Sequence, residues 1–326
     1  MGSNQRFIIK LVEQGYILPQ KLEQALTVSG VYPDSHAWHK FIDHLFLWLG
    51  GLALAFAVLF FVAYNWSELG RLFRFALVEV LVIAAIVGYW KLGTERMAAK
   101  VALLGGTIGL GVLLALYGQT YQTGADPWQL FFNWSLLILP WVLVGRFAPL
   151  WLLWLALVNL SVMLYFTAFP GAFGLLLPRD TGMYWTLFLL NTLALVLWEW
   201  AATRWSFMDR RWAIRLVALA SGYTITWLAL ISIVEGALTD RSGLVAGMIW
   251  LLWLASLGGV YRYRIRDLFM LTGGSLSVIV VVTTFLARHM LEGDPVGAFL
   301  FLAVVVMAGG SGSLIWLKRL HREWQS

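Results

Sequence analysis

The sequence predicts an all-α integral membrane protein: a polytopic bundle of about ten transmembrane helices preceded by a short N-terminal cytoplasmic helical module. Hydrophobic residues make up 60% of its 326 residues and charged residues only 12%, whereas about a quarter of a soluble domain is charged. Ten apolar stretches are each long enough to cross a bilayer, which takes about 20 residues. Lysine and arginine gather in every second connecting segment, which is the pattern of the positive-inside rule.

Composition also excludes several classes of function. The chain has no cysteine, which rules out disulfides, thiolate zinc sites and cysteine nucleophiles. Its net charge of +6 is scattered over short loops rather than collected in one patch, which argues against nucleic acid as a partner. No P-loop, GxSxG, HExxH or Rossmann glycine pattern occurs. We therefore expect neither an enzyme nor a bound cofactor, and the partner we expect first is the lipid bilayer.

Residues 1–41 precede the first long apolar run and are predicted to form the cytoplasmic module. In QRFIIKLVEQ the aliphatic residues lie near one helical face, Gly15 suits a helix C-cap, and Pro19 suits the start of a second helix. The module either docks another molecule or leans on the membrane surface. No cleavable signal peptide is apparent in it.

A histidine-containing motif, SHAWHKFIDH, follows this hairpin. His36, His39 and Asp43 are spaced so that they share one helical face, and imidazole and carboxylate groups so placed can hold a divalent metal. The same residue types are ordinary at a membrane interface. We favour the interfacial interpretation and expect no metal, with these three residues as the alternative.

The ten predicted spans are centred on residues 45–65, 74–92, 101–118, 129–145, 149–167, 183–202, 213–234, 243–261, 268–289 and 297–317. With a cytoplasmic N-terminus, most of the 23 lysines and arginines fall on the cytoplasmic side, and a wrong number of spans would scramble this alternation. Both termini are therefore predicted to be cytoplasmic. The chain then divides into 1–41 (module), 42–167 (spans 1–5), 168–318 (spans 6–10) and 319–326 (cytoplasmic tail), with 168–182 a candidate for dipping into the membrane.

Between spans 3 and 4 lies the polar segment, Tyr117–Trp134, which reads YGQTYQTGADPWQLFFNW. It holds amides, tyrosines and one aspartate but no lysine or arginine, and the predicted topology places it on the extracytoplasmic side. Asp126 and Pro127 fit the N-cap and first turn of span 4.

Further polar residues share this predicted outer side. AYNWSELGRLFR joins spans 1 and 2, and Glu79 follows inside span 2, where an ionisable group normally faces a partner or a wet cavity; Arg71 and Arg74 are its candidate partners. The full candidate set for ligand or partner binding is Tyr64, Asn65, Glu68, Arg71, Arg74, Glu79, Gln119, Tyr121, Gln122, Asp126, Trp128 and Asn133. Amides, a few charges and aromatic walls suit a small-ligand pocket, although interfacial loops also use polar residues to satisfy their backbone.

FVAYNWSELGRLFRFAL and YGQTYQTGADPWQLFFNWSLLILPW, with GYILPQKLEQAL near the start, resemble a bacterial family of multi-span membrane proteins known as domain of unknown function 2157. The resemblance covers roughly residues 5–165, and the later spans match only in being hydrophobic. It implies a bacterial inner membrane and brings no established activity. It also hints at a complex, because members are often encoded beside a second membrane-anchored protein.

The remaining spans carry packing signals rather than catalytic ones. Gly105 with Gly109 and Gly309 with Ser313 are small-residue pairs that let helices approach closely. Asn159 and Asn191 lie deep in spans 5 and 6, where a buried amide usually bonds a neighbouring helix.

Charged positions outside the polar segment have simpler interpretations. Glu199 falls near a span end, where interfacial placement suffices. The basic loops RWSFMDRRW and RYRIRD can touch anionic lipid.

Two functions stay open at this point. The first is transport or recognition of a small molecule through the candidate binding set, which would need coupling through very few charges. The alternative is a non-transporting scaffold or sensor that docks a membrane or periplasmic partner protein, which needs no charged path across the membrane.

Overall fold

The computed structural model describes residues 68–171, 181–236, 241–290 and 295–325, together with residues 14–28 and single residues or short runs between 8 and 64. Every regular element in this described part is a helix, which confirms the predicted all-α class. Nine of these helices are long and apolar enough to cross a membrane.

The long helices of the described part match the predicted spans one for one from span 2 onward. They are α4 (Arg71–Leu92), α5 (Met97–Tyr121), α6 (Pro127–Gly145), α7 (Ala148–Ala168), α8 (Gly182–Ala202), α9 (Arg211–Val234), α10 (Arg241–Gly259) with the π-helical turn η3 (Val260–Arg264), α11 (Leu268–Met290) and α12 (Pro295–Glu323). The largest difference is at α12, which continues past the predicted end of its span. Predicted span 1, residues 45–65, falls mostly outside the described residues.

The chain divides into two compact units, Met1–Arg74 and Phe75–Ser326. The first contains the short helices η1 (Pro19–Lys21) and α2 (Leu22–Val28). Pro19 begins η1, as its fixed φ favours. Gly15 has a φ of +77° and its N–H donates to the Val12 carbonyl at 3.0 Å, so a glycine closes the preceding turn as predicted.

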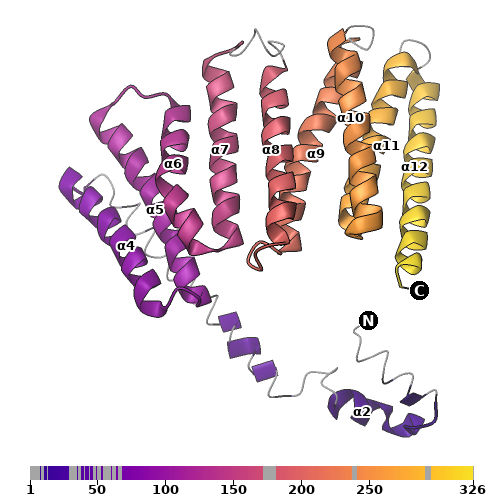
Figure 1. Cartoon of the computed structure of the whole chain (residues 1–326), viewed down its shortest axis with the longest axis horizontal. Coiled ribbons are helices and arrows are strands. Elements are labelled where there is room, and N and C mark those ends of the chain that lie inside the picture. Colours follow the sequence, from indigo (N-terminus) through magenta and orange to yellow (C-terminus); the bar gives the residue numbers. More distant parts are fainter. Residues whose placement is uncertain are drawn as a thin grey trace. The chain divides into compact units, whose positions relative to one another are not determined.

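Helices of the second unit alternate in direction, so their connections fall at the two ends of the bundle in turn (Figure 1). The closest neighbours are the hairpins α6–α7 and α8–α9, and α11 packs against both α9 and α12. Half of the most apolar window of α9 is buried, more than in any other described span. Helix α9 is therefore the central element of the C-terminal half.

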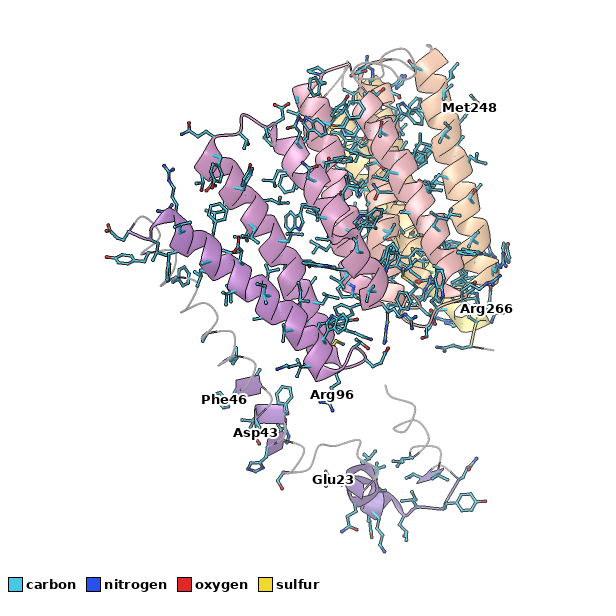
Figure 2. All side chains as sticks on the ribbon, turned by 60° about the vertical axis from the view of Figure 1, so that its left-hand side comes forward. Glu23, Asp43, Phe46, Arg96, Met248 and Arg266 are labelled. Atoms are coloured by element: carbon cyan, nitrogen blue, oxygen red, sulfur yellow. The ribbon has the colours of Figure 1, made fainter. Side chains whose placement is uncertain are left out.

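One end of the second unit collects most of its positive charge, and we call it the basic end. It carries the α4–α5, α6–α7, α8–α9 and α10–α11 connections and the C-terminal turns of α12. Its basic residues are Lys91, Arg96, Lys100, Arg146, Arg204, Arg210, Arg211, Arg215, Arg262, Arg264, Arg266, Lys318, Arg319 and Arg322. Figure 2 shows Arg96 and Arg266 at this end and Met248 toward the other.

Glycines bring neighbouring helices close together, although not always the ones the sequence singles out. A Cβ added at Gly109 would lie 2.8 Å from the Val82 side chain of α4, whereas one at Gly105 would meet nothing within 4 Å. The predicted close packing of the Gly105–Gly109 pair therefore holds for Gly109 and is wrong for Gly105, which shares that helical face but has no neighbouring helix close to it. Gly309 does pack closely, since its added Cβ would meet Ile279 of α11 at 3.0 Å.

Asn159 and Asn191 join α7 to α8 inside the bundle, which confirms the prediction that these amides bond a neighbouring helix. Asn191 Nδ2 donates to Asn159 Oδ1 at 2.6 Å, and Asn159 Nδ2 donates to Asn191 Oδ1 at 3.1 Å. Each amide also donates to the carbonyl four residues earlier in its own helix. The reciprocal pair leaves neither amide for a ligand.

Candidate functional site

The polar segment forms the connection from α5 to α6 and the first turns of α6. Helix α5 ends at Tyr121, and Gln122 takes the left-handed conformation with a φ of +44° as its C-cap. Asp126 is the N-cap of α6 and Pro127 its first residue, as predicted. The Asp126 carboxylate accepts a hydrogen bond from Trp128 Nε1 at 3.3 Å instead of capping a backbone N–H.

Several side chains of this segment are open to the surroundings. Gln119, Tyr121 and Gln122 are all exposed, and Tyr121 keeps 61% of its surface. The Tyr121 ring lies 4.8 Å from the Tyr117 ring and 6.2 Å from the Phe75 ring of α4. The segment therefore presents amides and a pair of neighbouring tyrosine rings rather than burying them.

Trp128 has a different role, because it is packed between α6 and α7. Its ring meets Tyr165 edge-on at 5.1 Å, and its backbone carbonyl accepts a hydrogen bond from Ser161 Oγ at 3.2 Å. Farther along α6, Asn133 is exposed, and Trp134 donates from Nε1 to the Thr107 carbonyl of α5 at 2.8 Å. These contacts fix the helices below the polar segment and leave Asn133 on the outer surface of the bundle.

The other described members of the predicted binding set are mostly exposed. Glu79 is exposed on α4 and makes no ion pair within the described part of the chain. In the N-terminal unit, Tyr64, Glu68 and Arg71 are exposed, and Arg74 Nε donates to the Leu69 carbonyl at 2.8 Å. Asn65 lies outside the described residues.

The metal alternative near the N-terminus gains no geometric support. His39 Nδ1 lies 2.5 Å from the Ser35 carbonyl oxygen, and both His39 and Asp43 are exposed. His36 lies outside the described residues. Among the residues that are described, no three His, Asp or Glu side chains come together in a way that could hold a metal ion.

The densest charged site of the second unit is an ion cluster at its basic end, formed by Glu199, Arg211, Arg215, Tyr261 and Asp267. Arg211 lies at the start of α9 and bonds carboxylates from two other elements. Its Nη1 lies 3.1 Å from both oxygens of Glu199 on α8, and its Nη2 lies 3.0 Å from Oδ2 of Asp267 before α11. One guanidinium thus ties three helices together.

The other two members complete this cluster. Arg215, one turn along α9, donates from Nη2 to Asp267 Oδ1 at 3.0 Å and from Nε to Oδ2 at 3.2 Å. Tyr261, in the π-helical turn η3, donates its hydroxyl to Glu199 Oε1 at 2.7 Å. Each carboxylate therefore has at least two donors, which is the condition for burying a charge without a large penalty.

Asp267 is the most buried charged group of this cluster, with 5% of its surface exposed. Burial alone would raise the pKa of its carboxyl, but hydrogen bonds from Arg215 and Arg211 and their positive charges lower the pKa below its ordinary value. Oδ1 also accepts the backbone N–H of Phe269 at 3.0 Å, which satisfies one donor in the first turn of α11. Asp267 is consequently ionised at neutral pH and fixes the start of α11.

Comparison with protein families finds a match to the N-terminal part of the chain. Residues 10–151 match the family DUF2157, described as predicted membrane proteins. No curated protein and no solved structure matches the chain. The DUF2157 match agrees with the resemblance found in the sequence motifs. Together with the nine apolar helices of the described part, it shows that the chain is a membrane protein in contact with the lipid bilayer.

The DUF2157 match includes the polar segment and ends within α7, so the ion cluster lies beyond it. Sequence reasoning missed this cluster, because Glu199 suits an interfacial position by itself and its partners are 12 and 62 residues away. The available signal was that the basic loops RWSFMDRRW and RYRIRD border the same end of the bundle. Since the members contact one another, the cluster is suited to holding helices together and to presenting positive charge.

Proposed function

We propose that this chain is a non-transporting recognition protein of the bacterial inner membrane, whose polar segment docks the extracytoplasmic part of a membrane-anchored partner protein. The observation that supports docking is the exposure of Gln119, Tyr121 and Gln122 on a connection whose α6 end is fixed by the N-cap Asp126 and by the contacts of Trp128. A rigid scaffold that displays aromatic and amide side chains is a typical protein-binding surface.

The chemistry of the segment defines the partner surface that would fit it. No lysine or arginine occurs between Lys100 and Arg146, and the only charge in the segment is that of Asp126. Carboxylate and amide oxygens accept hydrogen bonds, and Tyr117 and Tyr121 offer apolar rings with polar tips. The complementary surface carries hydrogen-bond donors from lysine or arginine around an apolar centre.

Small-molecule transport is the weaker of the two functions. Ion-coupled transport normally uses ionisable groups that pair with one another or line a wet cavity inside the bundle. Glu79 is instead exposed and unpaired within the described residues, and the deep amides Asn159 and Asn191 bond each other.

The distribution of lysine and arginine supports an orientation in which the basic end is cytoplasmic. In that orientation the polar segment would lie outside.

The absence of native cysteine permits a direct test by single-cysteine labelling. Thr123→Cys puts a thiol in the middle of the exposed connection without disturbing the left-handed Gln122, and Ser206→Cys puts one in the exposed α8–α9 connection at the basic end. Both variants are treated with a membrane-impermeant maleimide in intact cells and after purification. We expect Cys at 123 to be protected in cells and reactive once purified, and Cys at 206 to react only after the cells are opened.

Other labelling results would contradict specific parts of the proposal. If Thr123→Cys reacts freely in intact cells, the polar segment is open, which would contradict a docked partner. If Thr123→Cys reacts only after cell lysis and Ser206→Cys reacts in intact cells, the orientation is opposite to the one proposed.

A second experiment tests whether the segment itself holds the partner. A photo-reactive amino acid at position 123 is crosslinked in cells, and the crosslinked species is compared between the Tyr121→Ala and Tyr263→Ala backgrounds. Tyr263 is the matched control, because it is a tyrosine at the basic end that is also largely exposed, at 72% against 61% for Tyr121. Docking requires that the crosslink weaken with Tyr121→Ala and persist with Tyr263→Ala; equal yields in both would contradict it.

A further inference from the structure

A hollow of about 410 Å³ opens beside the ion cluster at the basic end. Its walls come from the start of α9, the η3–α11 connection and the last turns of α12. It is lined by Arg215, Arg266, Asp267 and Leu268, together with His321, Trp324 and Gln325 near the C-terminal end of the chain. We call it the cationic hollow.

The two arginines around this hollow carry more positive charge than the one carboxylate among its lining residues neutralises. The Asp267 carboxylate is already shared by Arg211 and Arg215. Arg215 uses Nε and Nη2 for that contact, and its Nη1 takes part in none of the hydrogen bonds among the described residues. Arg266 is exposed and makes no ion pair in the described part of the chain. The hollow therefore offers free guanidinium donors, which favour the oxygens of a phosphate group.

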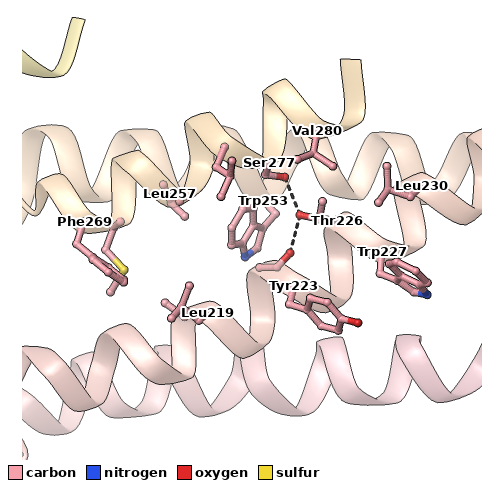
Figure 3. Close-up of a pocket in the computed structure, with 15 residues that line it drawn as sticks. Leu219, Tyr223, Thr226, Trp227, Leu230, Trp253, Leu257, Phe269, Ser277 and Val280 are labelled. Atoms are coloured by element: carbon pink, nitrogen blue, oxygen red, sulfur yellow. Dashed lines mark hydrogen bonds between the residues drawn. The ribbon is translucent and has the colours of Figure 1, made fainter. Parts of the chain in front are cut away.

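An apolar groove of about 370 Å³ runs along the bundle between α9, α10 and α11. Figure 3 shows Leu219 and Phe269 toward one end of it and Trp227, Leu230 and Val280 toward the other. Two of its hydroxyl groups, those of Thr226 and Ser277, are already bonded, since Thr226 Oγ1 lies 2.6 Å from Ser277 Oγ and donates to the Gly222 carbonyl. The groove therefore suits a hydrocarbon chain and offers little to a polar ligand.

The groove and the cationic hollow meet at Phe269. The Arg215 guanidinium, which lines the hollow, lies 5.2 Å from the centre of the Phe269 ring, which lines the groove. Along α9, Arg215, Leu219, Gly222, Thr226 and Leu230 follow one another at the spacing of a single helical face. Cationic and apolar walls are therefore consecutive parts of one surface.

The length of this surface matches one leaflet of a bilayer. From Arg215 to Leu230 the helix rises about 22 Å at 1.5 Å per residue. A bilayer is roughly 40–45 Å thick with its headgroups, so half of it is about the same length. The cationic part lies at the basic end and the apolar part extends toward the middle of the bundle, in the order of headgroup and acyl chain.

We propose that this surface is a binding site for one anionic phospholipid, with its phosphate in the cationic hollow and an acyl chain in the apolar groove. The guanidinium groups of the hollow favour an anionic headgroup. The apolar groove that continues from the hollow favours a lipid over a free anion, because only a lipid has an acyl chain to fill it. The proposal does not depend on the docking function of the polar segment, which lies at the opposite end of the bundle. It gives the helices beyond the DUF2157 match a role of their own.

The test uses the purified full chain in detergent, titrated with phosphatidylglycerol or phosphatidylcholine, with bound lipid counted by native mass spectrometry. We expect one phosphatidylglycerol to bind more tightly than phosphatidylcholine. Arg266→Gln removes a free cation and should weaken this binding roughly fivefold, the effect of about one cation near an anionic lipid. Arg264→Gln is the matched control, because it removes the same charge from an exposed position at the same end that does not line the hollow.

A second pair of variants tests the groove. A Cβ added at Gly273 meets nothing within 4 Å, and Gly273 lines the groove, so the side chain of Gly273→Leu starts from open space and occupies part of the groove. We expect binding to fall on the order of tenfold, since a well-filled space rejects added methylene groups. Gly247→Leu is the control, because Gly247 has equally open surroundings on α10 and does not line the groove. Leu276→Trp, at a position of the groove wall that is 60% exposed, repeats the test if Gly273→Leu folds poorly.

Three results would overturn the proposal. Equal binding of phosphatidylglycerol and phosphatidylcholine would indicate ordinary boundary lipid. Displacement of the bound lipid by excess inorganic phosphate would indicate a site for a free anion. Equal losses in the test variants and their controls would show that neither the hollow nor the groove holds the lipid.

Discussion

Arg215 holds Asp267 through two hydrogen bonds, from Nη2 to Oδ1 at 3.0 Å and from Nε to Oδ2 at 3.2 Å. Because Arg211 binds Oδ2 of the same carboxylate, two successive turns of α9 hold the beginning of α11. The Asp267 side chain is only 4% exposed, whereas the two arginines keep about a third of their surface. The carboxylate is thus the most buried charge of the cluster, and its loss leaves Arg215 without an ion pair among the described residues.

Asp267→Asn should lower the free energy of unfolding. Breaking one partner of a fully buried ion pair costs about 3–5 kcal/mol, and the exposure of both arginines reduces this to about 1–3 kcal/mol. Thermal unfolding in detergent measures the change. Asp209→Asn is the control, since Asp209 is exposed in the α8–α9 connection; equal effects of the two variants would show that the cluster adds no stability.

The contribution of Asp267 should also depend on pH. The pKa of its carboxyl is lowered in the folded protein by Arg215 and Arg211 despite burial, whereas in the unfolded chain it is about 3.9. The stabilisation is therefore complete above the unfolded value and is lost as pH falls through the folded value. The difference in Tm between wild type and Asp267→Asn should be constant near neutral pH and should shrink in acid; a difference unchanged down to pH 3 would refute this.

The paired amides Asn159 and Asn191 should behave as one unit. Asn159→Leu or Asn191→Leu alone leaves the other amide without its partner across the helix interface, so each should destabilise the protein. The double variant should be less destabilised than the two single effects combined, with a coupling of about 0.5–1.5 kcal/mol, the range for hydrogen bonds between membrane helices. A double-mutant cycle of unfolding free energies measures the coupling, and strict additivity would mean that the two side chains act independently.

The sequence predicts the helices of this protein far better than the contacts between their side chains. Apolar runs and alternating charge locate nine spans, because length and topology are local properties that the bilayer imposes. The cap at Asp126 and Pro127 is also local and is predicted correctly. Arg211 and Asp267 are 56 residues apart, and their pairing depends on how α9 meets α11, which no local pattern encodes.

The candidate binding set shows the same limit. The sequence places Glu79 and Gln122 on the same predicted side, but it does not say which way each side chain points around its helix. Glu79 has no ion pair among the described residues, and Trp128 is held between α6 and α7 by Tyr165 and Ser161. Rotation of each helix about its axis is set by packing, and packing was the missing information for Gly105 as well.

Gly111→Ala tests this packing directly at the interface of α5 and α6. A Cβ at Gly111 would collide with the Trp134 ring, which is held in place by its hydrogen bond to the Thr107 carbonyl. The methyl group must displace the indole, so we expect a loss of about 1–3 kcal/mol of unfolding free energy, as for other overpacked sites. Gly105→Ala is the matched control on the same helix, where the added Cβ meets nothing within 4 Å and alanine's higher helix propensity favours a gain of up to about 1 kcal/mol. Thermal unfolding of the two variants should therefore shift in opposite directions, and a parallel shift would mean that Trp134 moves aside at no cost.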